Sequence, residues 1–230
     1  MLLPSSNNMR AFVIGNGPSL NATPLDKLRG ECTFGLNRFN LLGLDWDPTW
    51  WVMADVREGD GWWDWPDLLR RPSMFLFREQ DRELIEPYGS KNVIFYPRCE
   101  HIGGDYIPDS WHLDSGPCDY GGGISVAIQA AAELGRNPIY VVGADLYRYR
   151  GPDEGDVNHF HPDYSFYRLS KHGREINTPA VWEATNKRLI HCHEIARRSA
   201  GRIGIKILNA TVGGALEAYE RVDIHEVLGG

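Results

Sequence analysis

The residues best suited to chemistry begin directly after the apolar run 11–14. Gly15 and Gly17 leave the backbone open to the close approach of a ligand, and the Asn16 amide can donate a hydrogen bond to it. Ser19 can cap the following turn or donate to the ligand as well. A buried strand that ends in such a loop is typical of a phosphate-binding site. The alternative is a tight turn that needs glycine and binds nothing.

Two common phosphate motifs do not fit this loop. The dinucleotide fingerprint requires a third glycine where Leu20 stands, and an acidic residue about 20 positions on, where Asn37 and Arg38 stand instead. The Gly-Lys-Ser/Thr ending of a P-loop is also absent. The sequence therefore argues against an NAD enzyme and a Walker-type ATPase, and Asn37 is expected to reach the ligand from the neighbouring strand end.

A second glycine cluster precedes a helical pattern. Gly122 and Gly123 come just before the residues at helical spacing, so they leave bare N–H groups at the positive end of a helix. Such a helix start suits a carboxylate or a phosphate. The alternative interpretation is close packing of the glycines against the sheet.

Polar residues also follow the apolar run 139–142. Asp145, Tyr147 and Tyr149 alternate in sequence, so an extended chain places them on one face. A phenol on that face can donate a hydrogen bond to negative charge that develops on a leaving group. Tyr147 and Tyr149 are therefore candidate donors to a phosphate.

The densest polar and aromatic stretch contains His159 and His161, which share a face if the chain is extended. Histidine titrates near neutral pH, so either residue could act as general base for an acceptor hydroxyl. Metal binding together with Asp163 and simple loop packing are the alternatives. His172 competes for the role of base.

Short, continuous apolar runs fit strands that are covered on both faces, as in a mostly parallel sheet. A helix is expected from 123, with Gly135 just after its end, and a longer helix with Thr178 as N-cap and Pro179 as first residue. This alternation predicts one Rossmann-like, doubly wound α/β domain over 1–230, with helices on both faces. The expected strand runs are 11–14, 50–53, 74–77, 93–96, 139–142 and 203–208, with a further strand ending near Asn37.

Two long stretches interrupt this alternation. Residues 55–71 are rich in tryptophan and acid, and residues 99–123 are rich in polar and aromatic residues. Both are expected to be active-site loops, because long loops in open α/β sheets usually carry function. His191 and His193 lie off the apolar stripe of the last long helix, so both are expected to be solvated.

Composition excludes several partners. The net charge is −7 and no long basic run is present, which argues against nucleic acid. The four cysteines form no C-x-x-C pair, which indicates reduced thiols in a cytoplasmic protein and no zinc site. No apolar run is long enough for a transmembrane segment. Peripheral contact with a membrane and a homo-oligomeric state are left open.

Three blocks carry a resemblance to a known group of proteins. The first is VIGNGPSL followed by GLNRFN, the second is residues 121–147, and the third, a looser match, is residues 206–219. In this order the chain resembles the bacterial sialyltransferases that decorate lipooligosaccharide. It also resembles the 6-hydroxymethylpterin pyrophosphokinase-like proteins that share their fold.

The sialyltransferase resemblance implies an inverting transfer from a CMP-activated acidic sugar to a hydroxyl acceptor, with no metal or other cofactor. It implies that the loop at Gly15–Ser19 and Asn37 hold the CMP part of the donor. Tyr147 falls on the tyrosine that donates to the departing phosphate, and Tyr149 lies close to it. The family's catalytic histidine lies between the tyrosines and the last long helix, where His159 and His161 stand.

Two departures keep other functions open. Gly122 stands where the sialyltransferases have serine, and Asp55 stands where they have Asn-Pro. An acid beside a phosphate favours an intervening cation, so Asp55 favours a Mg²⁺-dependent pyrophosphokinase acting on a pterin-like alcohol. A non-catalytic nucleotide-binding protein is the third alternative. The best single expectation is a transferase with a nucleotide-sugar donor.

Overall fold

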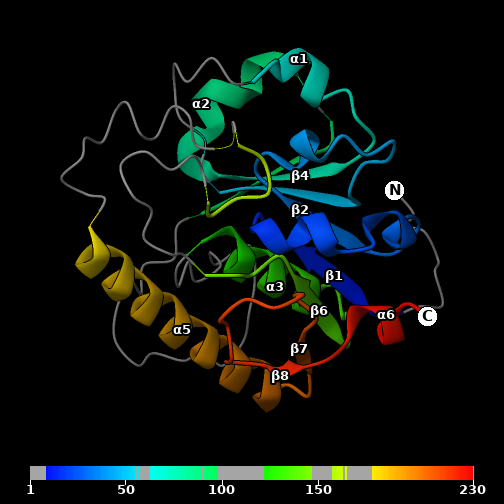
Figure 1. The fold of residues 1–230 in the computed structure, drawn as a ribbon. Helices are drawn as coiled ribbons and strands as arrows, with labels where there is room; N and C mark the ends of the chain where they lie inside the picture. The colour runs from blue at the N-terminus through cyan, green and yellow to red at the C-terminus, as the bar shows by residue number, and fades with distance from the viewer. Residues whose placement is uncertain are drawn as a thin grey trace.

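The fold is an open α/β sheet with helices on both faces, as the sequence predicts (Figure 1). It is seen in a computed structural model, which describes residues 9–54, 56, 63–89, 91–97, 122–146, 157–162, 164 and 178–229. The described residues form one eight-stranded sheet in the order β5-β4-β3-β2-β1-β6-β7-β8. All neighbouring strands are parallel. The strands are β1 Ala11–Ile14, β2 Thr33–Leu36, β3 Trp50–Met53, β4 Met74–Arg78, β5 Val93–Tyr96, β6 Ile139–Val142, β7 Ile207–Asn209 and β8 Glu220–Arg221.

The strand order reverses beside β1. The chain builds outward from β1 to β5 and then returns to place β6 on the other side of β1. Open α/β sheets bind ligands outside the carboxyl ends of the strands at such a switch point. The loop that starts at Gly15 leaves β1 at this point, next to the end of β6.

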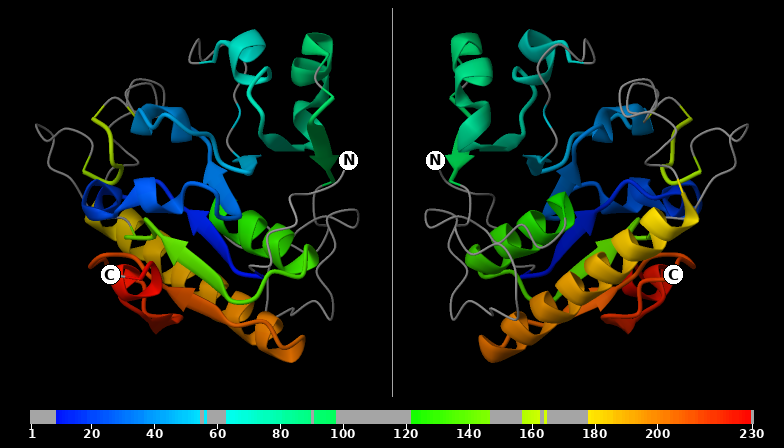
Figure 2. Two further views of the ribbon diagram at one scale, coloured as in Figure 1. Left: turned by 90° about the vertical axis from the view of Figure 1, so that its right-hand side faces the viewer. Right: turned by 90° about the vertical axis from the view of Figure 1, so that its left-hand side faces the viewer.

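Helices α3 (Gly123–Glu133) and α5 (Pro179–Arg202) lie side by side on one face of the sheet (Figures 1 and 2). Short elements cover the other face. They are α1 Trp65–Leu68, α2 Arg82–Ile85, α6 Ile224–Val227, η1 Pro18–Ala22, η2 Leu25–Leu28 and η3 Phe39–Leu42, with η4 Glu79–Asp81 and η5 Glu86–Tyr88 next to α2.

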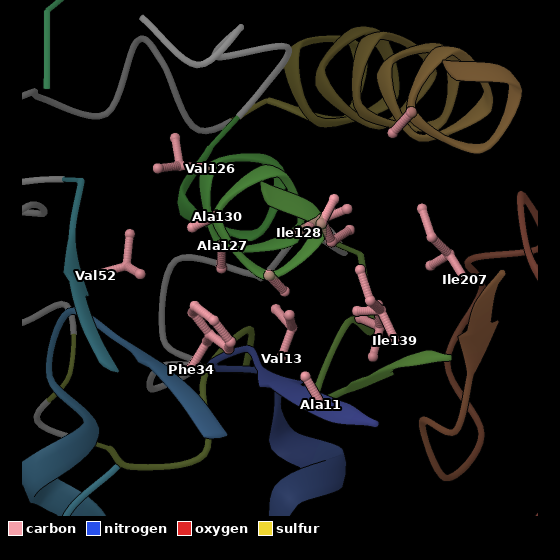
Figure 3. Close-up of a cluster of buried hydrophobic side chains, with 14 of the residues drawn as sticks. Ala11, Val13, Phe34, Val52, Val126, Ala127, Ile128, Ala130, Ile139 and Ile207 are labelled. Carbon is pink, nitrogen blue, oxygen red and sulfur yellow. The ribbon is translucent and has the colours of Figure 1, made fainter. Parts of the chain in front are cut away.

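The core has two layers, one on each face of the sheet, because side chains alternate along each strand. Ala11 and Val13 point toward α3, whereas Phe12 and Ile14 belong to the cluster on the opposite face (Figure 3). The face of α3 that meets the sheet carries Ala127, which is fully buried. Small side chains let the helix approach the strands closely, so a large residue at 127 would overpack this layer by about 1–3 kcal/mol.

Both predicted helix ends are confirmed. Gly135 has φ +68°, and its N–H donates to Ala132 O while that of Arg136 donates to Ala131 O, which is a Schellman ending. Thr178 caps α5 by accepting from the Val181 N–H at 3.3 Å. These ends fix where α3 stops and where α5 begins on the sheet.

Two expectations about local structure were wrong, and one strand was not predicted. The run 203–208 is strand only from Ile207, because Ile203 and Gly204 still belong to the turn that ends α5. The short edge strand β8 has no apolar run to predict it. His193 is buried, with 5% of its surface exposed, because the C-terminal half of α5 packs against Tyr219 and the sheet.

Candidate functional site

The loop at Gly15–Ser19, here called the first loop, packs against the end of β6 through its two glycines. The Gly15 N–H donates to Val142 O at 2.8 Å, and the Gly17 N–H donates to Gly143 O at 2.9 Å. A Cβ on Gly15 would lie 2.3 Å from Gly143 O, and one on Gly17 would lie 1.8 Å from the Asp145 carboxylate. Packing between the chain segments therefore requires both glycines, and their role toward a ligand stays a prediction.

The hydroxyl and the backbone N–H of Ser19 both donate to the Asp145 carboxylate. The hydroxyl donates at 2.7 Å and the N–H at 3.2 Å. Burial raises the pKa of Asp145, and the hydrogen bonds from Ser19 counteract that rise. A carboxylate thus occupies the place against Ser19 that the sequence assigns to a phosphate. The sequence signals for Asp145 are its spacing with Tyr147 and Tyr149 and its place in the second block of the resemblance.

The loop after β7 encloses the other side of Asp145. The Ala215 N–H donates to Asp145 O at 3.1 Å, and the Thr211 hydroxyl accepts from the Ala144 N–H at 3.1 Å. Arg221 ties this loop together by donating to the carbonyl oxygens of Gly213 and Gly214. The third block of the resemblance, 206–219, therefore lies beside the switch point.

Asn37 joins the ends of β2 and β3. Its φ of +41° is unusual for a residue other than glycine. Its backbone oxygen accepts from Trp51 Nε1 at 2.7 Å, and its Oδ1 accepts from the Ala54 N–H at 3.0 Å. These bonds set the orientation of the amide, so Nδ2 is the group that Asn37 can offer to a ligand.

Helix α3 begins at the same edge of the sheet. A Cβ on Gly123 would lie 3.2 Å from Ala54 Cβ and 3.4 Å from Leu36 Cδ2, and one on Gly15 would lie 3.3 Å from Ile124 Cδ1. Gly122, the residue before the helix, has a φ of +139°. The first N–H groups of an α-helix lack partners within the helix, so those of α3 suit an anion at the ends of β1 to β3.

Phe160 and Tyr164 contact the first loop and the turn after β2. The Phe160 N–H donates to Asn16 O at 3.0 Å, and Asn21 Nδ2 donates to Phe160 O at 3.0 Å. Arg38 Nη1 donates to Tyr164 O at 3.0 Å. The sequence did not single out Tyr164 or Arg38 for this site, because their contacts come from parts of the chain far apart in sequence.

The Asn16 side chain makes hydrogen bonds to Gly15, Leu36 and Tyr164. In the amide orientation that suits its neighbours, its nitrogen donates to Gly15 O at 3.3 Å and to Leu36 O at 3.2 Å. Its oxygen then accepts from the Tyr164 hydroxyl at 2.8 Å. The Asn16 amide, expected to donate to a ligand, thus has protein partners for both of its atoms.

The two candidate bases have different surroundings. The His159 ring stacks on the Tyr164 ring with centroids 4.0 Å apart and planes 7° apart. The His161 ring meets Phe160 edge-on, with centroids 6.4 Å apart. The structure therefore brings His159 against the residue that contacts Asn16, whereas the ring contact of His161 is with its neighbour in the chain.

Several predicted site residues lie outside the residues that the structure describes. They are Asp55, Tyr147, Tyr149, Asp163 and His172, and their roles stay predictions. Of the two expected active-site loops, only parts are described. Residues 65–68 form α1, and Trp65 is buried against Phe77 with ring centroids 5.9 Å apart, so this part is core.

Within the described residues, no group of three or more His, Cys, Asp or Glu side chains is arranged to hold a metal ion. None of the helices described for this chain has the length and apolar character needed to cross a membrane.

Comparison with known proteins identifies a solved structure with a similar fold. No family model matches the chain, and no curated protein matches its sequence. Among solved structures, the chain is similar to the MAf glycosyltransferase from Magnetospirillum magneticum AMB-1, with a TM-score of 0.56 and 15% sequence identity. The match covers 96% of this chain and 35% of that one, so this chain spans about a third of the length of that protein. The two chains therefore share an α/β fold over nearly all of the present sequence.

Proposed function

We propose that this chain is a glycosyltransferase-like enzyme that transfers a sugar from a nucleotide-activated donor to a hydroxyl-bearing acceptor. The observation that carries the proposal is the convergence of the first loop, Asn37, the start of α3 and the His159 segment at the switch point of the sheet. The fold shared with the MAf glycosyltransferase supports it. The sharper form is an inverting transfer from a CMP-activated acidic sugar, as the resemblance to the sialyltransferases implies.

The charges suggest how such a donor would lie. The Asp145 carboxylate repels a phosphate at Ser19, so we assign the donor's anionic groups to the positive end of α3, at Gly122 and Gly123. A carboxylate accepts hydrogen bonds from hydroxyl groups, and an amide Nδ2 donates to carbonyl and ether oxygens. Asp145 and Asn37 therefore suit the ribose and the base of a nucleoside.

The reaction we propose is a direct displacement at the anomeric carbon. The acceptor oxygen forms the new bond to this carbon while the bond to the donor phosphate breaks, which inverts the centre. His159, or His161 in its place, takes the proton of the acceptor hydroxyl. Tyr147 and Tyr149 would donate hydrogen bonds to the phosphate that leaves. No cofactor is needed for this balance of atoms and charge.

One sequence feature favours a second candidate, a Mg²⁺-dependent pyrophosphokinase. Ala54 follows β3 and lies against Gly123 at the start of α3, and the next residue along the chain is Asp55. A carboxylate following this strand end could share Mg²⁺ with a pyrophosphate group. The non-catalytic alternative shares the binding site but not the chemistry.

Nucleotide binding separates these functions. Isothermal titration with CMP, CDP and ATP, each with and without Mg²⁺, should show a cytidine nucleotide binding without the metal. Incubation with CMP-sialic acid and a galactoside acceptor should then release CMP. Binding of ATP alone, and only with Mg²⁺, would favour the pyrophosphokinase. Binding without any release of CMP would contradict the sialyltransferase form.

A further inference from the structure

Tyr164 makes several contacts that the proposed mechanism does not use. Its ring stacks on His159, its hydroxyl donates to Asn16 Oδ1 at 2.8 Å, and its backbone oxygen accepts from Arg38. The residue is buried, with 8% of its surface exposed. The Arg38 guanidinium also lies over the Tyr164 ring, 5.8 Å from its centroid. Tyr164 is thus held from the turn after β2 and from the first loop.

The geometry of the stack matters for His159. Rings whose planes differ by 7° meet face to face, so the contact restrains the plane of the imidazole. The contact does not engage the ring nitrogens, which lie in that plane. A stack can therefore hold a histidine in place while its nitrogens remain the groups that exchange a proton.

Two further hydrogen bonds hold Phe160 on the first loop and on η1, which follows it. The Phe160 backbone donates to Asn16 O and accepts from Asn21 Nδ2, both at 3.0 Å. Phe160 and Tyr164 are therefore both bonded to Asn16 in the first loop. Displacement of Asn16 would move Phe160 and Tyr164 together.

We propose that Tyr164 is a positioning residue: through its hydrogen bond to Asn16, it sets the position of His159 relative to the first loop. The catalytic consequence rests on the proposed function, but the positioning itself does not. A donor that settles on the first loop then meets a base whose ring plane is already fixed. Preorganisation of this kind matters because a displacement of about 1 Å can cost 100-fold in rate.

The positioning is testable in the free protein by NMR. The imidazole Cε1–Hε1 signals of His159 and His161 are recorded across a pH titration in the wild type, Tyr164→Phe and Tyr164→Leu. Tyr164→Leu removes the ring, so the His159 signal should move downfield as the ring-current shift is lost, while the His161 signal should move less. Tyr164→Phe keeps a ring but loses the bond to Asn16, so the His159 signal should broaden or shift by a smaller amount.

Tyr88→Phe is the matched control, because Tyr88 is exposed and lies in η5 beside α2. It should leave both histidine signals unchanged. If Tyr164→Leu folds, as judged by its circular dichroism, and leaves the His159 signal and titration as in the wild type, the inference is overturned. Should the leucine variant fail to fold, an unchanged His159 signal in Tyr164→Phe overturns the inference in its place.

Kinetics provide the second readout. Tyr164→Phe should lower kcat by roughly 10–100-fold, with a smaller change in KM, since the loss concerns alignment and not donor affinity. A variant with wild-type kcat contradicts the positioning role. If the wild type itself transfers no sugar while the His159 signal still depends on Tyr164, the proposed function fails and the positioning stands.

Discussion

Two histidine–tyrosine pairs among the described residues differ in geometry. His159 and Tyr164 stack face to face, and the tyrosine hydroxyl bonds to a third residue, Asn16. His193 and Tyr219 meet edge-on at 78°, and the hydroxyl lies 2.8 Å from His193 Nδ1. The first arrangement restrains a ring plane, whereas the second engages a ring nitrogen.

The surroundings of the second pair make it structural. Burial lowers the pKa of His193 to about 4 and raises that of Tyr219, so both side chains are neutral over the physiological range. The pair joins the C-terminal half of α5 to the chain just before β8. Residue types alone therefore do not reveal the role of a His–Tyr pair, because the role depends on which atoms meet and how deeply they are buried.

The largest expected effect is on catalysis by the stacked histidine. Under the proposed function, His159→Ala should lower kcat by about 10²–10⁴, because a general base contributes that much, with donor affinity nearly intact. Steady-state rates of CMP release measure this. His191→Ala is the control, since His191 is an exposed histidine on α5.

The same assay on two other variants shows which histidine is the general base. If His159→Ala stays active while His161→Ala or His172→Ala is inactive, the base is the other histidine and the chemistry stands. Full activity of all three variants on a verified substrate would remove histidine from the mechanism. The first loop would then mark a binding site alone.

The second prediction concerns the buried pair. The unfolded state binds a proton on His193 below its ordinary pKa of about 6.5, whereas the folded state resists it down to about 4. The stabilising contribution of this group is therefore complete above about pH 6.5, and it should fall as pH falls from there to about 4, by on the order of 3 kcal/mol in all.

Denaturant unfolding at several pH values measures this loss. The free energy of unfolding of His193→Gln should depend less on pH over this window than that of the wild type, because glutamine does not titrate. His191→Gln should follow the wild type, since His191 is exposed. If the free energy of unfolding depends on pH equally in the wild type and in His193→Gln, the buried pair does not resist protonation.

The third prediction separates the two roles of Asn16. Asn16→Ala should weaken cytidine nucleotide binding by roughly 1–3 kcal/mol, whether through a lost donor or a displaced loop. Asn16→Asp keeps an oxygen for the Tyr164 hydroxyl but loses the donation to Gly15 O and Leu36 O. Isothermal titration on both variants shows whether affinity follows the bond to Tyr164. Unchanged affinity in Asn16→Ala would place the nucleotide elsewhere.

The sequence predicts the parts of this protein that depend on local patterns. Apolar runs identified β1, β3, β4, β5 and β6, and capping residues identified the end of α3 and the start of α5. The run 203–208 misled because apolar residues also fill the turn that ends α5. His193 was misplaced because helical periodicity does not show that Tyr219 lies against that side of the helix.

The site was predictable only in its local elements. The loop at Gly15, the turn at Asn37 and the glycines before α3 were found from their types and spacing. The pairing of Asp145 with Ser19 spans 126 residues, as does the bond from Arg38 to Tyr164. Contacts of this kind follow from strand order at the switch point, which no local pattern specifies. They also change the interpretation of the loop, because Asp145 fills the place assigned to a phosphate.

The smallest expected effect is that of removing metal. If the anionic groups of the donor bind at the start of α3 and His159 takes the acceptor proton, no step needs a cation. EDTA should then leave both nucleotide affinity and CMP release unchanged, and Asp55→Asn should retain activity. Loss of both on EDTA treatment, restored by Mg²⁺ and reproduced by Asp55→Asn, would place a cation beside the phosphate. A bound cation would then neutralise the phosphate charge that the present proposal assigns to N–H groups, and the pyrophosphokinase would become the better interpretation of the same fold.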